Sequence, residues 1–162
     1  DVSKGIYQKP FGGTVDYDYI MWIDSDMFFS PKQFEELMDM DKDIASGIYK
    51  MQDQVGYATV EKYNNQEFIE NSKFTFLNDE ILSEKPDIFP VEYTGFGWML
   101  IKKGVIESME YPWFRPEWMN FGNDIKDFTS EDVGFCMNAI KKGYKIYVNQ
   151  KIRVGHEKSL II

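Results

Sequence analysis

Two aspartates at the end of an apolar run are the first residues whose types and spacing could do chemistry. Asp24 and Asp26 follow Tyr19–Ile23, which reads YIMWI. An apolar run without alternation predicts a strand buried on both faces of a parallel sheet. Ligands of open α/β sheets bind beyond the carboxyl ends of strands, and two carboxylates there repel each other unless a cation lies between them. The pair is therefore a candidate metal site; the alternative is a solvated turn in which Asp caps the local backbone.

A second acidic pair opens a predicted helix. Apolar residues recur at i, i+3, i+4 and i+7 from Val133, Ser130 precedes the pattern and Gly143 follows it, so we expect a helix from Glu131 to Lys142 with Ser130 as its cap. A carboxylate on such a rigid element can serve as a general base, and we assign that role to Asp132 first and Glu131 second. The alternative is structural, because the helix dipole stabilises any acidic residue in a first turn.

The single histidine, His156, follows Gly155 near the end of the chain. Its imidazole could join the carboxylates of the first acidic pair on one ion. Imidazole favours somewhat softer ions, so Mn²⁺ is expected over Mg²⁺. The alternative is an ordinary surface or core histidine.

Four stretches, taken in order, resemble one family. The segment 18–37 (DYIMWIDSDMFFSPKQFEEL) is similar to the DxD region of GT-A fold glycosyltransferases. Thr94–Gly97 followed by WMLIKKGV resembles their glycine-containing turn and strand near the acceptor, and Thr129–Phe135 (TSEDVGF) resembles the acidic helix start of family 2 enzymes. Arg153–His156 (RVGH) is similar to the late histidine that joins the metal site in many of these enzymes.

This resemblance implies a set of site residues. Asp24, Asp26 and His156 would hold Mn²⁺ or Mg²⁺ on the diphosphate of a nucleotide sugar, with Asp24 either a ligand or a contact of the ribose or a metal-bound water. Gly95 and Gly97 would line the substrate site. The implied fold class is α/β, with a mixed, mainly parallel sheet flanked by helices.

The resemblance is incomplete at the start of the chain. Only 23 residues precede Asp24, whereas one βαβ unit takes about 30 residues or more. Three explanations follow: the chain is a fragment, a partner chain completes the sheet, or donor binding has been abandoned. We expect the first, with residues 1–162 forming one domain that corresponds to the C-terminal two thirds of a GT-A-like catalytic domain. We also expect self-association through an exposed sheet edge formed by Tyr19–Ile23 or a neighbouring strand.

The expected function is metal-dependent transfer of a sugar from a nucleotide-diphosphate sugar to a hydroxyl group of a carbohydrate or glycoconjugate, with inversion, or an inactive fragment of such an enzyme. The alternative is a non-catalytic carbohydrate-binding module on the same fold. A nucleotidyltransferase would need a glycine-rich phosphate loop, and Gly12-Gly13 is too short for one. Trp98, Trp113 and Trp118 are candidates to stack on sugars; the alternative for each is the core.

Composition excludes other classes of protein. The net charge of −9 opposes binding to nucleic acid and to anionic membrane surfaces. The single cysteine, Cys136, excludes an internal disulfide and, with a single histidine, a zinc cage of Cys and His ligands. We expect a reducing compartment, the cytoplasm, and no transmembrane segment.

The remaining pattern alternates strands and helices. We expect a helix from Pro31 to about Met38, a hairpin or edge strand over residues 64–76, and an aromatic binding loop over Tyr111–Asn123. Expected strands are Asp43–Tyr49, Gly56–Glu61, Val91–Tyr93, Gly97–Ile101, Lys145–Val148 and Ile152–Val154.

Overall fold

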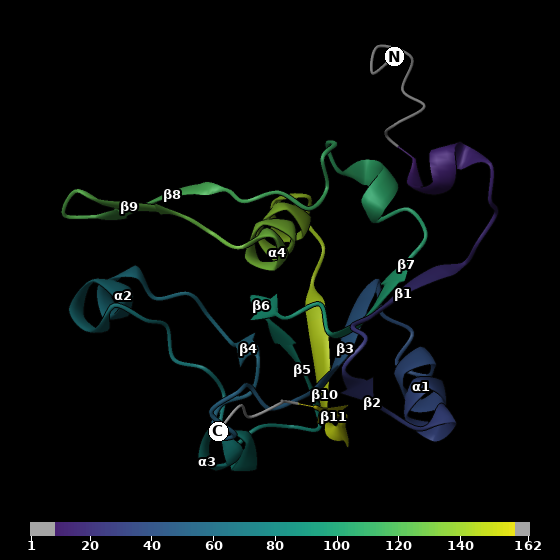
Figure 1. Cartoon of the computed structure of the whole chain (residues 1–162), viewed down its shortest axis with the longest axis horizontal. Helices are drawn as coiled ribbons and strands as arrows, with labels where there is room; N and C mark the ends of the chain where they lie inside the picture. The colour runs from purple at the N-terminus through teal and green to yellow at the C-terminus, as the bar shows by residue number, and fades with distance from the viewer. Residues whose placement is uncertain (1–8, 158–162) are drawn as a thin grey trace.

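The protein is a mixed α/β structure built on one five-stranded sheet (Figure 1). The computed structural model describes residues 9–157. The helices are α1 (Pro31–Met38), α2 (Asn65–Asn71), α3 (Asp79–Ser83) and α4 (Glu131–Lys141), with 3₁₀ turns η3 (Pro10–Gly13) and η4 (Ile106–Ser108). The strands are β1 (Tyr19–Ile23), β2 (Met27–Phe28), β3 (Ile44–Ile48), β4 (Thr59–Val60), β5 (Ile88–Val91), β6 (Tyr93–Thr94), β7 (Trp98–Lys102), β8 (Trp118–Gly122), β9 (Ile125–Phe128), β10 (Ile146–Arg153) and β11 (Gly155–His156).

The strand order in the main sheet is β1-β7-β3-β10-β5. Only β3 and β10 pair in parallel; β1 with β7, β7 with β3, and β10 with β5 are antiparallel. The expectation of a mainly parallel sheet is therefore not confirmed. Even so, β1, β3 and β10 all run in one direction, because β7 is antiparallel to both β1 and β3. Their carboxyl ends meet at one edge of the sheet.

The apolar run of β1 predicted burial on both faces, and that expectation is wrong, whereas the expectation that Tyr19–Ile23 or a neighbouring strand forms an edge of the sheet is confirmed. β1 lies at the end of the sheet with β7 as its neighbour, and Trp22 and Ile23 are exposed. An apolar run predicts that a strand forms but not where it lies in the sheet. Loops can cover the apolar side chains of an edge strand, so such a strand can be as apolar as a central one. The ring of Phe114, for example, lies 4.8 Å from that of Trp22. Within residues 9–157 no strand pairs with the other edge of β1, and self-association there stays a prediction.

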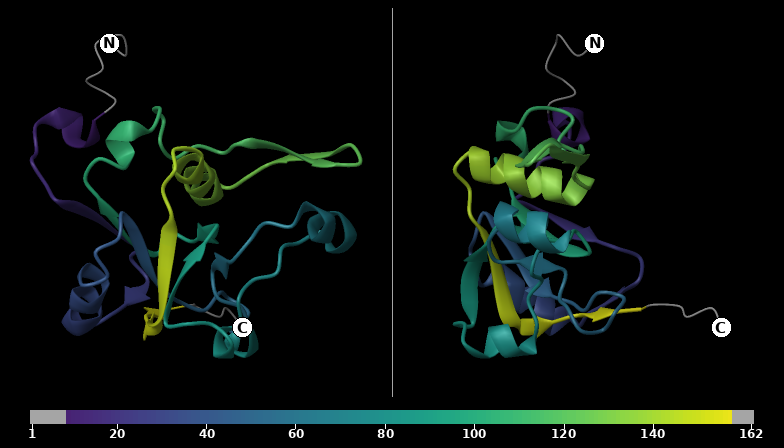
Figure 2. Two further views of the ribbon diagram at one scale, coloured as in Figure 1. Left: turned by 180° about the vertical axis from the view of Figure 1, so that it is seen from behind. Right: turned by 90° about the vertical axis from the view of Figure 1, so that its left-hand side faces the viewer.

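The central strands are buried on both faces because helices cover each side (Figure 1). Ile44 and Ile48 of β3 point into a cluster that contains Phe135 of α4. Ala45, between them, points into a second cluster that contains Leu37 of α1. Successive strand residues face opposite sides of a sheet, so this alternation places β3 in the middle layer of an α/β sandwich. The right panel of Figure 2 shows α4 crossing one end of the sheet.

The helix expected after Asp26 is confirmed in position and in its cap. The Ser30 hydroxyl accepts from the Gln33 backbone N–H at 3.3 Å, and the Gln33 side-chain oxygen accepts from the Ser30 N–H at 2.7 Å. This capping box begins α1 at Pro31. The side-chain amide of Gln33 also donates to the Arg153 carbonyl at 2.6 Å, which ties α1 to the end of β10.

Residues 64–76 are not the hairpin or edge strand expected from the sequence. Residues 65–71 form α2, because the Asn64 side chain accepts from the Glu67 N–H at 3.2 Å and caps a helix there. The two strands expected over Lys145–Val148 and Ile152–Val154 are a single strand, β10, with a register shift after Val148. None of the helices within residues 9–157 has the length and apolar character that crossing a membrane requires.

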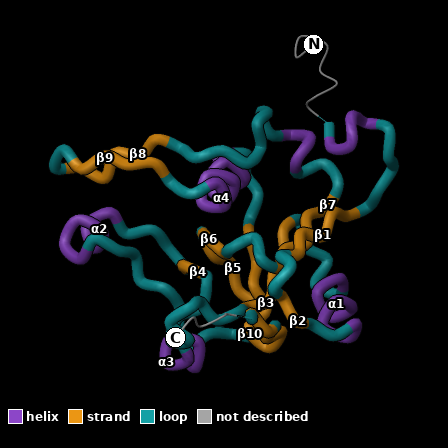
Figure 3. Tube along the Cα trace, viewed as in Figure 1, coloured by secondary structure: helices purple, strands orange, loops and turns teal. Residues whose placement is uncertain are grey.

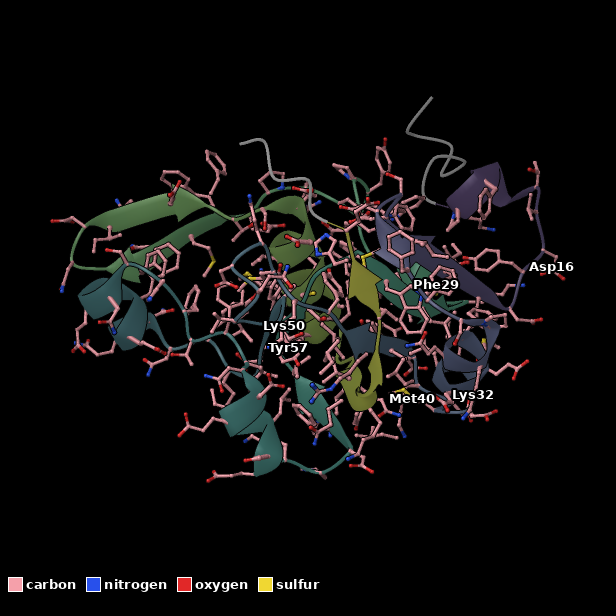
Figure 4. All side chains as sticks on the ribbon, turned by 60° about the horizontal axis from the view of Figure 1, so that its bottom comes forward. Asp16, Phe29, Lys32, Met40, Lys50 and Tyr57 are labelled. Atoms are coloured by element: carbon pink, nitrogen blue, oxygen red, sulfur yellow. The ribbon has the colours of Figure 1, made fainter. Side chains whose placement is uncertain are left out.

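A charged network joins the end of β3 to α3 and β10. The Lys50 ammonium contacts Asp79 at 2.9 Å and lies 4.1 Å from the centre of the Tyr57 ring (Figure 4). The Tyr57 hydroxyl and Arg153 both donate to Asp79, at 2.8 and 2.9 Å. The hydrogen bond from Lys50, and then those from Tyr57 and Arg153, hold the pKa of Asp79 well below its usual range.

We predict that Asp79→Asn lowers stability at neutral pH and loses this effect in acid. A lowered folded-state pKa contributes stability above the unfolded pKa, about 3.9, and the contribution is lost as pH falls through the folded value. Urea unfolding as a function of pH checks this: the difference between the wild-type chain and Asp79→Asn should be full at pH 7, begin to shrink below about pH 4, and vanish only when the pH falls below the lowered folded-state pKa of Asp79. The control is Asp39→Asn, outside this network. A difference that stays constant with pH would contradict the prediction.

Candidate functional site

The candidate site is built where β1, β3 and β10 end. The turn after β1 is fixed by Asp24, whose N–H donates to the Gly97 carbonyl at 2.9 Å and whose carbonyl accepts from Met27 at 3.1 Å. Met27 then pairs with His156, because β2 and β11 form a short antiparallel ladder. The Glu157 N–H closes the ladder on the Asp26 carbonyl at 2.8 Å. Residues more than a hundred positions apart in the sequence are thereby joined at one place.

The ladder sets the Asp26 carboxylate against the His156 ring. Asp26 Oδ2 and His156 Nε2 lie 3.2 Å apart, and the histidine side chain is only 12% exposed. The other ring nitrogen, Nδ1, lies 2.9 Å from the Lys50 carbonyl oxygen. A carbonyl can only accept, so Nδ1 carries a proton. Two arrangements of Nε2 are then possible. It donates a hydrogen bond to the Asp26 carboxylate, or it presents a lone pair to that carboxylate, and the second arrangement is favourable when a cation lies between the two groups.

The donor set suits a first-row divalent ion. An imidazole whose other nitrogen is anchored by a backbone carbonyl, next to a carboxylate, is the usual arrangement of a metal-ligating histidine. Asp24 is exposed and is not assembled with these two side chains: within the described part of the chain no group of three His, Cys, Asp or Glu residues is arranged to hold a metal. Two protein ligands leave coordination positions for phosphate oxygens and water.

Tyr49 is a site residue that the sequence analysis missed. It is buried at the end of β3, its hydroxyl accepts from the Gly97 N–H at 3.0 Å, and its ring meets the His156 ring edge-on at 5.2 Å. Burial raises the pKa of Tyr49, and the nearby carboxylates of Asp24 and Asp132 raise it further. Besides burial, the charges of Asp24 and Asp132 therefore both raise the pKa of the Tyr49 hydroxyl, and the ring of the same tyrosine packs on His156.

The two glycines of the predicted substrate turn, Gly95 and Gly97, make room for Tyr49. A Cβ atom on Gly95 would lie 2.2 Å from the Tyr49 hydroxyl oxygen, and one on Gly97 would lie 2.9 Å from the same atom. The structure therefore gives these glycines a packing role, which a buried tyrosine imposes. Their role in binding substrate stays a prediction.

The predicted general base, Asp132, lies in the first turn of α4 and is half-buried, whereas Glu131 is exposed. The Tyr93 hydroxyl donates to Asp132 Oδ2 at 2.8 Å, and the Val133 N–H donates to Oδ1 at 2.8 Å. Ser130 occupies the cap position, but its hydroxyl donates to Asp132 rather than capping a backbone N–H. These contacts fix the orientation of Asp132, whereas Glu131 has no comparable set among the described residues.

The three candidate tryptophans have different environments. Trp98 is fully buried in the core around α1, so the prediction that its ring stacks on a sugar is wrong. Trp113 is half-buried and packs against the core around α4. Trp118 is 58% exposed on β8 and is the one whose ring is open to a ligand. The binding loop expected over Tyr111–Asn123 is in part a strand, because it includes β8.

Comparison with known proteins gives a likeness of fold. No protein-family model matches the chain, and the search of curated proteins found no match. Among solved structures, the crystal structure of A197 from STIV is similar, with a TM-score of 0.55 and 17% sequence identity. The alignment covers 98% of this chain and 64% of A197. This chain thus spans less than two thirds of that protein.

We predict that Gly95→Ala destabilises the fold and that Tyr49→Phe partly rescues it. The added methyl group collides with the Tyr49 hydroxyl, at a cost of about 1–3 kcal/mol. Tyr49→Phe alone leaves the Gly97 N–H without its partner and costs about 1–3 kcal/mol. The double variant removes the collision, so its loss in the free energy of unfolding should be smaller than the sum of the two.

Urea unfolding of the single and double variants measures this coupling. The control is Gly56→Ala, where the new methyl group meets the flexible end of Met51 instead. Combined with Tyr49→Phe, that substitution should give additive losses. Additivity for the Gly95 pair as well would show that the two residues do not constrain each other.

Proposed function

We propose that the chain carries the metal and base sites of a glycosyltransferase that uses a nucleotide-diphosphate sugar and has a GT-A-like fold. The observation that carries this proposal is the juxtaposition of Asp26 and His156 at 3.2 Å, with His156 Nδ1 held by the Lys50 carbonyl. The carboxylate of Asp132 is held by the Tyr93 hydroxyl and the Val133 N–H. Burial, and then the charge of this carboxylate, raise the pKa of Tyr49, whose ring packs on His156. A197 supports the fold alone.

The residues divide the chemistry of sugar transfer. Asp26 and His156 would hold Mn²⁺ or Mg²⁺, which when bound supplies a positive charge that stabilises a diphosphate leaving group. Asp24, which is exposed in the turn before Asp26, would contact the ribose of the donor or a metal-bound water. Asp132 would accept the proton of the acceptor hydroxyl group, and Tyr93 would keep its carboxylate in position. A base acting on an acceptor across from the leaving group corresponds to inversion.

We predict that the chain binds Mn²⁺ through Asp26 and His156. Asp26→Asn and His156→Ala should each weaken binding by about tenfold or more, because loss even of a residue behind a ligand costs about that much. The free Mn²⁺ signal in electron paramagnetic resonance gives the affinity without any assay of activity. Asp39→Asn is the charge-matched control. Equal affinity in all four proteins would contradict the metal site.

We predict that Asp132, and not Glu131, is the base. Asp132→Asn should lower kcat for sugar transfer by about 100-fold with little change in Mn²⁺ affinity, since a positioned base contributes about 10²–10⁴-fold. Glu131→Gln is the neighbouring matched change and should lower kcat much less. The readout is release of the nucleotide diphosphate with a panel of donor sugars. The opposite order of the two effects would move the role to Glu131.

A further inference from the structure

The β8–β9 hairpin and α2 extend together from one side of the sheet, in both the front and the rear views (Figures 1 and 2). Loops connect them to the rest of the molecule (Figure 3). The inner face of the hairpin is occupied: the Phe121 ring stacks on Phe68 of α2 at 4.1 Å, and Phe74 packs beside them. The contact with α2 fixes which face of the hairpin is turned outward.

The outer face of the hairpin carries an aromatic pair. Trp118 and Phe128 are direct partners in the ladder, and their rings meet at 4.7 Å. Residues alternate between the faces of a strand, so Asn120 and its partner Lys126 follow on this same outer face. Trp118 is 58% exposed and Phe128 is 64% exposed. Exposed rings beside polar side chains form a surface with an apolar platform and hydrogen-bonding groups at its edge.

The aromatic pair lies at the root of the hairpin, next to α4. Glu117 and Thr129 exchange hydrogen bonds at 2.9 Å, from the Thr129 N–H to the Glu117 carbonyl and from the Glu117 N–H to the Thr129 hydroxyl. The Arg115 carbonyl lies so close to Gly134 of α4 that a Cβ there would be 2.1 Å away. Asp132 is four positions after Phe128, so their Cα atoms are at most about 14 Å apart. A chain-like ligand on the pair can extend to Asp132.

We propose that Trp118 and Phe128 form the platform on which a neutral oligosaccharide acceptor binds, with Asn120 and Lys126 contacting its hydroxyl groups. The proposal rests on the proposed function, because it takes Asp132 as the base that the acceptor must reach. Aromatic rings suit the apolar faces of sugars, and planar or charged side chains suit their hydroxyls. The net charge of −9 disfavours an acidic polysaccharide.

Titration calorimetry with four neutral hexasaccharides tests the platform: maltohexaose, cellohexaose, mannohexaose and chitohexaose. At least one should bind, and Trp118→Ala and Phe128→Ala should each weaken that binding by about tenfold or more, as expected for losing the burial of one aromatic ring. Trp118→Tyr should restore most of it. Phe11→Ala is the matched control, since Phe11 is also 58% exposed but lies in η3.

The outcomes separate this proposal from the proposed function. Asp26→Asn should leave saccharide binding unchanged, because Asp26 does not belong to the platform. If the wild-type chain binds a saccharide but neither binds Mn²⁺ nor transfers a sugar, the proposed enzyme is refuted and the platform is not. No binding of any of the four sugars, or equal binding by Trp118→Ala, would overturn the platform. Sedimentation velocity gives a further check: a dimer of the wild-type chain that Trp118→Ala abolishes would make the pair a protein interface and would also overturn it.

Discussion

The common direction of β1, β3 and β10 is the constraint on which the candidate site depends. Because β7 runs against both β1 and β3, and β10 runs with β3, three carboxyl ends meet at one edge of the sheet. The edge therefore receives Asp24 and Asp26 from β1, Tyr49 from β3 and His156 from the segment after β10. A mixed sheet does this as well as a parallel one, because the carboxyl ends of β1, β3 and β10 meet when these three strands run in one direction, and the β2–β11 ladder then joins Asp26 to His156.

Tyr49 couples the packing of that edge to its chemistry. The tyrosine ring supports His156, its hydroxyl holds the Gly97 N–H, and Gly95 and Gly97 lack side chains where the ring must fit. The Gly97 carbonyl in turn accepts from Asp24. One buried aromatic residue thus contacts the histidine and both glycines, and the Gly97 carbonyl links it to the aspartate turn.

Local sequence signals predicted the elements that carry the site. The capping box at Ser30 and Gln33 predicted the start of α1, and the apolar spacing from Val133 predicted α4; both depend on contacts within one helical turn or on a helix face. The same reasoning misassigned residues 64–76, where a cap at Asn64 outweighs an irregular apolar pattern. It also placed Trp98 at a substrate site, because burial in the core depends on residues far along the chain.

The sequence by itself determined the apolar strand ending in Asp24 and Asp26, the acidic start of α4 and the presence of one histidine. Only the tertiary structure decided that β1 is not buried on both faces, that His156 reaches Asp26 and not Asp24, and that Tyr49 packs on His156. The physical reason is the range of the interactions. Helix caps and apolar periodicity depend on residues a few positions apart. The ladder of β2 with β11 instead pairs Met27 with His156, which are far apart in the sequence, and no local pattern indicates that pairing.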